Sequence, residues 1–169
     1  MEVLFENQFT MTKESAKEIS KVSTQRPRAF ALLLMVICII IAIVSSIPSG
    51  FNLFWFTVYV ILFVYFSIIR ARILHVASTQ LYQQQLVLHN HKPIAKIVTV
   101  FEEHMESHSA NGSQITILYD RITSVKKTAN LMILIYEKTV IIPIDLAGFT
   151  KGTPEAFEAF LLEKGIKVK

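Results

Sequence analysis

No Asp, Glu, Lys, Arg or His occurs between residues 29 and 69. This uncharged block contains two apolar runs of 19 residues, 29–47 and 51–69, separated by a Pro-Ser-Gly sequence at 48–50. As a helix, each run would be about 28 Å long, which matches the ~30 Å hydrocarbon core of a bilayer. Because lipid offers no hydrogen-bond partner to backbone amides, helices are the favoured way to cross it. We therefore expect a transmembrane helical hairpin over residues 29–70, turning at 48–50.

Basic residues flank the two runs on the side away from this turn. Arg26 and Arg28 precede the first run, and Arg70 and Arg72 follow the second. Because Lys and Arg near span ends are retained in the cytoplasm, both termini are expected there, in a multi-pass protein of the plasma membrane. A cleaved signal peptide is the competing interpretation of the first run, but a 28-residue segment with four Glu precedes that run. The absence of ionisable residues from both runs argues against a pore or pump.

The N-terminal segment, residues 1–28, contains patterns for a strand and a juxtamembrane helix. Residues 3–11 alternate with a period of two, interrupted at Asn7, which predicts a half-buried strand. Ser15 and Glu18 have the spacing of a capping box, so we expect a helix from about residue 13 to 25. Whether this strand joins a sheet formed by the rest of the chain is left open. After Arg70 the helical spacing continues to about Gln85.

Residues 71–169 predict a domain of about 100 residues, the size of a small independent fold. Alternating segments give six strands, with turns at Asn111-Gly112 and Glu137-Lys138 and a division of residues 94–110 near Glu103. A final helix begins at Thr153-Pro154, presents Phe157, Phe160 and Leu161 on one face and is closed by Gly165. The predicted fold class is membrane α+β: a transmembrane hairpin plus a strongly bent antiparallel sheet covered by a C-terminal helix.

The C-terminal part contains a set of short features: Tyr119-Asp120 with Ile122, the apolar strand 131–136, Ile142-Pro143, Phe149, and the segment 157–161. In these features it resembles the YcxB-like family of bacterial two-span membrane proteins. The resemblance implies an N-terminal strand, two membrane spans and a cytoplasmic C-terminal domain similar to a pleckstrin-homology (PH) fold. It implies no activity. The family often has Trp at the position of Tyr119, and a basic residue after the proline, where this chain has Ile144-Asp145.

The cluster with the clearest potential for chemistry is His104-Met-Glu-Ser-His108. It resembles a zinc motif only loosely, because the zinc-protease pattern needs Glu directly after the first His and a helical segment. Here the pattern of the segment predicts a strand, on which the two His share a face. Weak metal binding by these two His is therefore an alternative to a purely structural role. With only five Gly and no phosphate-binding loop, the sequence predicts no enzyme, no cofactor and no structural metal. The net charge of +4 is too small to favour nucleic acid as a partner.

Two function hypotheses follow, and a membrane metalloenzyme is the third, weaker one. In the first, the protein is a membrane-anchored, non-enzymatic interaction or regulatory module whose PH-like domain binds a protein at the inner leaflet. Weak contact with anionic lipid is expected at Arg70, Arg72, Lys126 and Lys127. In the second, it is an envelope-defence or toxin-immunity protein. The bilayer and a protein of unknown identity are the expected partners, and homo-oligomerisation is compatible with all three hypotheses.

Overall fold

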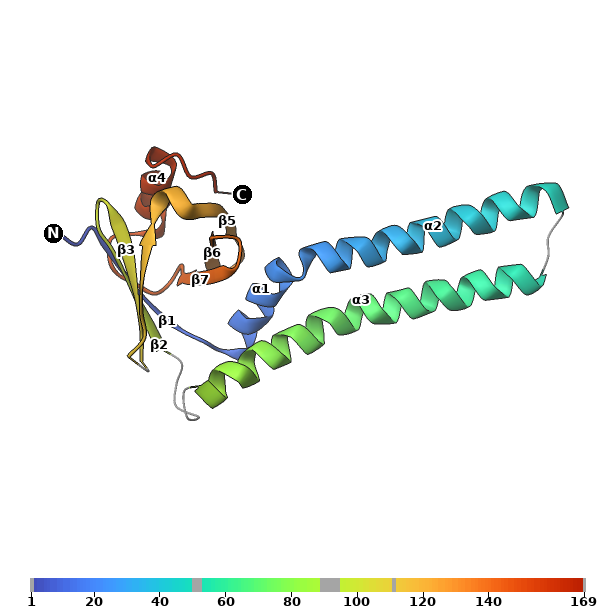
Figure 1. Ribbon diagram of the computed structural model, residues 1–169, viewed down its shortest axis with the longest axis horizontal. Helices are drawn as coiled ribbons and strands as arrows, with labels where there is room; N and C mark the ends of the chain where they lie inside the picture. The colour runs from blue at the N-terminus through green and yellow to red at the C-terminus, as the bar shows by residue number, and fades with distance from the viewer. Residues whose placement is uncertain (1, 50–52, 89–94, 111, 169) are drawn as a thin grey trace.

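The computed structural model describes residues 2–49, 53–88, 95–110 and 112–168. Figure 1 shows a unit of strands and short helices from which one long helical hairpin extends. Both chain termini lie at this unit, at the far end of the molecule from the tip of the hairpin. The predicted turns at 48–50 and 111–112 each include a residue outside the described ranges, and His89 and His91 lie outside them as well.

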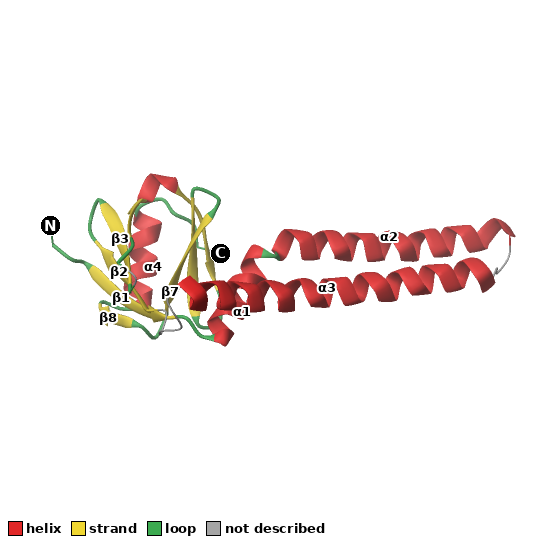
Figure 2. Cartoon of the chain, turned by 60° about the horizontal axis from the view of Figure 1, so that its bottom comes forward, coloured by secondary structure: helices red, strands yellow, loops and turns green. Residues whose placement is uncertain are grey.

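The hairpin consists of α2 (Gln25–Ser49) and α3 (Leu53–Leu88), which run side by side in opposite directions (Figures 1 and 2). Gln25–Val44 and Leu53–Val87 are long and apolar enough to cross a membrane, and almost nothing in them is buried by the rest of the chain. Large apolar side chains are exposed along both helices, among them Phe30, Ile40, Phe54, Trp55 and Ile61. The prediction that the second helix continues to about Gln85 is confirmed.

The short helix α1 (Lys13–Ser23) is present where the sequence predicted it, but its capping box is different. The Thr12 hydroxyl accepts from the Ser15 backbone N–H at 3.1 Å, and the Ser15 hydroxyl accepts from the Thr12 N–H at 2.8 Å. The prediction of a Ser15–Glu18 box was wrong by one helical turn, because the chain enters the helix at Thr12. Glu18 is thereby free to bind elsewhere: its carboxylate accepts from Thr128 and Asn130.

A five-stranded antiparallel sheet contains the N-terminal strand as an inner strand. The strand order is β4-β3-β2-β1-β8, where the strands are β1 (Phe5–Thr10), β2 (Ala95–Val100), β3 (His104–Ser109), β4 (Gln114–Leu118) and β8 (Phe149–Lys151). The first strand therefore joins the sheet, pairing with β2 on one side and β8 on the other. The sequence predicted seven strands and missed β8, whose three residues are too few to show periodicity.

A second antiparallel sheet has the order β5-β6-β7, with β5 (Ile122–Lys127), β6 (Leu131–Tyr136) and β7 (Val140–Asp145). The predicted Glu137-Lys138 turn joins β6 to β7, and both residues have positive φ, +49° and +65°. The sequence predicted one strongly bent sheet, whereas the chain forms two. A short 3₁₀ turn, η1 (Tyr119–Arg121), separates β4 from β5 and ends the first sheet there.

Two apolar clusters cover opposite faces of β6. On one face, Met132 and Leu134 pack with the five-stranded sheet and with α4 (Pro154–Glu163). On the other face, Leu131 and Ile133 pack with Phe9 and the apolar face of α1. Burial on both faces explains why β6 is a continuous apolar run without alternation. The second cluster also joins the hairpin to the unit, because the end of α3 packs against it.

The C-terminal helix covers the first cluster as predicted. Phe157 and Leu161 are fully buried, and Phe160 is partly buried beside the rings of Phe5 and Tyr119. The Thr153 hydroxyl caps the helix by accepting from the Ala156 N–H at 3.2 Å, and Gly165 follows with φ +80°. The sequence therefore predicted both ends of this helix and its buried face.

Asn7 is buried, although it interrupts the apolar alternation of β1. Its side-chain amide donates to the backbone carbonyl of Asp145 at 2.7 Å and accepts from the backbone N–H of Asp145 at 3.1 Å. Asn7 thus links β1 to the end of β7 through both of its polar atoms. The interruption in the sequence is a position where the two sheets are joined by a polar side chain.

Candidate functional site

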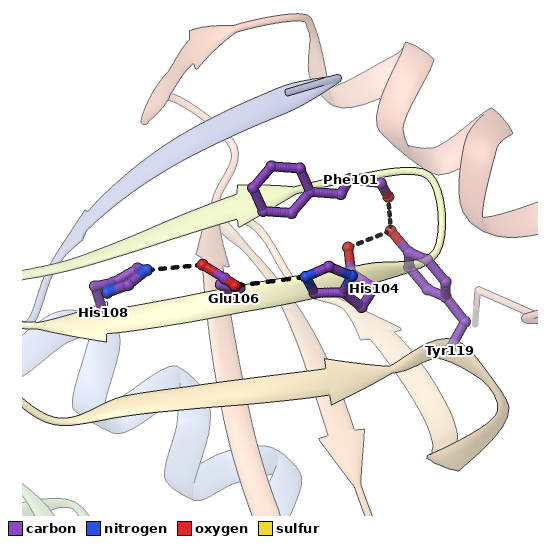
Figure 3. Close-up of polar contacts among 5 residues, drawn as sticks. All are labelled: Phe101, His104, Glu106, His108 and Tyr119. Carbon is purple, nitrogen blue, oxygen red and sulfur yellow. Dashed lines mark hydrogen bonds and ion pairs between the residues drawn. The ribbon is translucent and has the colours of Figure 1, made fainter. Parts of the chain in front are cut away.

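A row of three polar side chains crosses one face of β3. His104, Glu106 and His108 alternate with Met105, which is buried in the first cluster, so the three lie on the outer face of the five-stranded sheet. Figure 3 shows the two imidazole rings on either side of the Glu106 carboxylate. The segment is a strand, so it cannot form the helical zinc motif. On a strand, alternate residues share a face, which brings these three side chains together.

The Glu106 carboxylate contacts both rings. Its Oε1 lies 3.4 Å from Nε2 of His104, and its Oε2 lies 3.1 Å from Nε2 of His108. The hydrogen bond from His108 is the main cause that holds the pKa of Glu106 below its ordinary value, and His104 adds to this effect. The lowered pKa favours the ionised form of the Glu106 carboxylate.

One end of the row is held in place by Tyr119. The hydroxyl of Tyr119 donates toward the backbone carbonyl of Phe101 at 2.5 Å and lies 3.2 Å from that of His104 (Figure 3). The Phe101 ring stacks on the His104 imidazole, with ring centroids 5.0 Å apart. Burial raises the pKa of Tyr119, so this phenol stays protonated and serves as a donor. Tyr119 is therefore a structural residue that fixes the turn between β2 and β3.

The row has limited chemical scope. Within the described ranges, no group of three or more His, Cys, Asp or Glu side chains is arranged to hold a metal ion. The Nε2 atoms of both rings are directed at the carboxylate that lies between them. The arrangement therefore provides a row of polar side chains whose polar atoms contact one another.

The four residues for which the sequence predicted lipid contact come from two elements. Arg70 and Arg72 lie within α3, whereas Lys126 and Lys127 lie at the end of β5. The Lys127 ammonium donates to the Glu158 carboxylate at 2.7 Å, which raises the pKa of Lys127. Lys126 donates to the side chain of Gln25. The structure therefore gives both lysines partners within the protein, and lipid contact at these four residues stays a prediction.

The sequence analysis missed Lys96, a cation on the inner face of a sheet. In β2, Lys96 shares its face with the buried Val98 and Val100, and it pairs across the strands with the buried Phe9. Burial lowers the pKa of Lys96. The signal is visible in the alternating sequence AKIVTV, because Lys96 stands in register with the two valines.

Comparison with known proteins supports the family resemblance. The model of the family described as YcxB-like protein matches residues 100–161. This match covers the chain from the end of β2 to α4, and this part of the chain is therefore similar to that family. No curated protein and no solved structure matched the chain.

Proposed function

We propose that this protein is a membrane-anchored, non-enzymatic module whose two-sheet unit binds a protein partner at the cytoplasmic face of the membrane. The observation that carries the proposal is the continuity of α3. Its first part exposes apolar side chains over a length that suits a bilayer. Near its end, Leu81, Tyr82 and Leu86 pack against the second apolar cluster. One helix thus connects the apolar hairpin firmly to the folded unit.

The PH-like fold is part of this proposal. Two packed antiparallel sheets and a C-terminal helix over the core agree with the fold that the YcxB resemblance implies. One fold can carry many functions, so this likeness supports an interaction role by analogy of fold alone. The His104–Glu106–His108 row, whose polar atoms contact one another, agrees with this preference.

The most suitable place for a protein partner is the edge strand β4. The N-terminal strand pairs with β2, which leaves β4 as the outer strand at that end of the five-stranded sheet. Ile115 and Leu118 on β4 are 44% and 39% exposed. An edge strand offers unpaired backbone groups to which an extended segment of another protein can add as a further strand. We therefore expect the partner to contribute such a segment.

In-cell photo-crosslinking of the full chain tests the partner site. A photoreactive residue at Thr116 in β4 is expected to give a discrete adduct, because the partner strand lies beside it. The matched control is the same residue at Thr139, in the exposed β6–β7 turn. The adduct should disappear with Ile115→Lys, since a charge on an edge strand opposes strand addition. Equal adducts at Thr116 and Thr139, or an adduct that Ile115→Lys leaves unchanged, would contradict the proposal.

Weak contact with anionic lipid is a separate part of the proposal. Two lysines at the end of β5 are worth roughly 1 kcal/mol each near an anionic leaflet, and both already have partners within the protein. Because β1 lies within the main sheet, the test needs the full chain, here in nanodiscs of neutral or anionic lipid. Hydrogen exchange in β5 should be equal in the two. Strong protection in anionic lipid that salt removes would instead make the unit a lipid reader.

A further inference from the structure

A pocket of about 300 Å³ lies where the hairpin joins the two-sheet unit. Its walls come from α1, from the end of α3, and from strands β2 and β7. Figure 1 shows α1 and the end of α3 beside the strands at this junction. The volume is at the lower end of the range of small-molecule sites in proteins, about 300–1,000 Å³.

The charge among the described residues of the pocket has one sign. Lys96 is a cationic residue of the lining, and no Asp or Glu is among the described residues that form it. Within the described residues, the Lys96 ammonium has no hydrogen bond or ion pair, and its burial lowers its pKa. Placing a lysine on the inner face of a sheet costs stability unless an anion compensates it. The pocket therefore has the electrostatic character of an anion site.

Neutral polar groups surround the ammonium. Ser20 and Ser23 reach the pocket from α1, and Gln80, Gln84 and Gln85 reach it from α3. Hydroxyl and amide groups can donate hydrogen bonds to oxyanion oxygens in addition to the charged lysine. The rest of the wall is apolar and includes Met11, Leu81 and Pro143. A ligand that suits both parts of the wall has an anionic group and a small apolar body.

The position of the pocket along α3 indicates where such a ligand comes from. At 1.5 Å per residue, Ala77 lies roughly 12 Å and Gln85 roughly 24 Å beyond residue 69, where the apolar run ends. The headgroup layer of one leaflet extends only about 5–8 Å beyond the hydrocarbon core. This step rests on the proposed membrane span. A bilayer lipid would therefore have to leave its leaflet to reach the pocket, whereas a dissolved anion would not.

We propose that the pocket at the junction of α1, α3 and β2 binds a small water-soluble organic anion, whose carboxylate or phosphate group contacts Lys96 and the surrounding serine and glutamine side chains. Because the pocket has walls from both the hairpin and the sheets, the bound anion contacts both parts of the molecule. Binding thus couples the occupancy of the pocket to the way the unit is held on the hairpin.

Hexyl phosphate is a suitable probe, and calorimetric titration of the full chain in a neutral detergent measures its binding. We expect saturable binding that becomes at least tenfold weaker with Lys96→Met. Binding should be unchanged by Lys138→Met, a matched change in the exposed β6–β7 turn. Hexanol has the same chain without the charge, and its affinity should be the same for Lys96→Met and for the natural protein. Equal affinity of hexyl phosphate for the natural protein and Lys96→Met, or no saturable binding, would overturn the proposal.

Two further measurements keep the result unambiguous. The melting temperature of Lys96→Met without ligand should be at least that of the natural protein, because an uncompensated ammonium has been replaced by an apolar chain of similar length. Hexyl phosphate should raise the melting temperature of the natural protein only. In nanodiscs, its affinity should be the same with neutral and with anionic lipid. Weaker binding of hexyl phosphate in anionic nanodiscs would contradict the proposal that the ligand is a dissolved anion. The melting temperatures and the nanodisc affinities do not depend on which side of the membrane the unit occupies.

Discussion

Replacing Phe157 tests whether the two ends of the chain share one core. Phe157 of α4 is fully buried, and its ring lies 5.5 Å from that of Phe5 in β1 and 5.7 Å from that of Phe149 in β8. Truncating a buried Phe to Ala costs about 3–5 kcal/mol, and each aromatic pair contributes about 0.5–1.5 kcal/mol of its own. At about 1.4 kcal/mol for each tenfold change, Phe157→Ala should raise the opening equilibrium of the unit roughly 100- to 4,000-fold.

Hydrogen exchange in β6 measures this opening in the full chain, because β6 is buried on both faces and exchanges only when the unit opens. The matched control is Leu162→Ala on the same helix, where the side chain is 54% exposed. That change should cost below about 0.5 kcal/mol, or roughly twofold. Phe157→Leu should give a smaller effect than Phe157→Ala, of the same sign, if the alanine variant is too unstable to purify. Equal exchange in the Phe157→Ala and Leu162→Ala proteins would refute the packing described for α4.

Three further predictions concern single contacts. Asn7→Ala leaves the backbone N–H of Asp145 without its partner, whereas the Asp145 carbonyl keeps the Gly148 N–H, and should cost about 1–3 kcal/mol by hydrogen exchange in β1; the exposed Gln8→Ala is the control, and equal costs would contradict the buried link. Gly148→Ala would place a Cβ 2.1 Å from the backbone oxygen of Gln8, whereas Gly165→Ala enters open space at a positive φ; the first should lower the melting temperature more than the second, and the reverse order would count against the close approach of β1. Burial raises the pKa of Glu18, but hydrogen bonds from Thr128 and Asn130 outweigh this and leave it below the ordinary value of 4.5. Its stabilising effect is therefore present above pH 4.5 and is lost as the pH falls through the lowered pKa, so protection factors in α1 should fall on acidification in the natural protein and not in Glu18→Gln.

The long helices and the strands with clear periodicity could be predicted from the sequence. The uncharged block predicts long apolar helices, and the Thr153-Pro154 and Gly165 signals define α4, so these elements depend on local patterns. The residues that cap α1 were less predictable, since the spacing allows Ser15 to pair with either Thr12 or Glu18. The pair that forms depends on the residue at which the chain enters the helix, which is Thr12. Because Glu18 takes no part in the cap, its carboxylate can accept from Asn130, more than a hundred residues away.

The candidate sites depended more on tertiary structure than the elements did. The sequence placed His104 and His108 on one face of a strand, which the structure confirms, but the carboxylate contacts follow from side-chain conformations. Lys96 stood in register with two valines, yet the pocket beside it is formed by helices distant in sequence. The short strand β8 likewise depends on pairing with β1 at the other end of the chain, which no local pattern records. The division into two sheets occurs at the 3₁₀ turn η1, between β4 and β5.

The side of the membrane on which the unit lies is the most direct test of the account. In a Cys38→Ala background, single cysteines at Ser49, near the hairpin tip, and at Ser113, in the β3–β4 connection, are treated in intact cells with an impermeant maleimide. The account predicts labelling at position 49 in intact cells and at position 113 only after the membrane is opened. Labelling at position 113 but not at position 49 in intact cells would contradict the cytoplasmic placement of the unit.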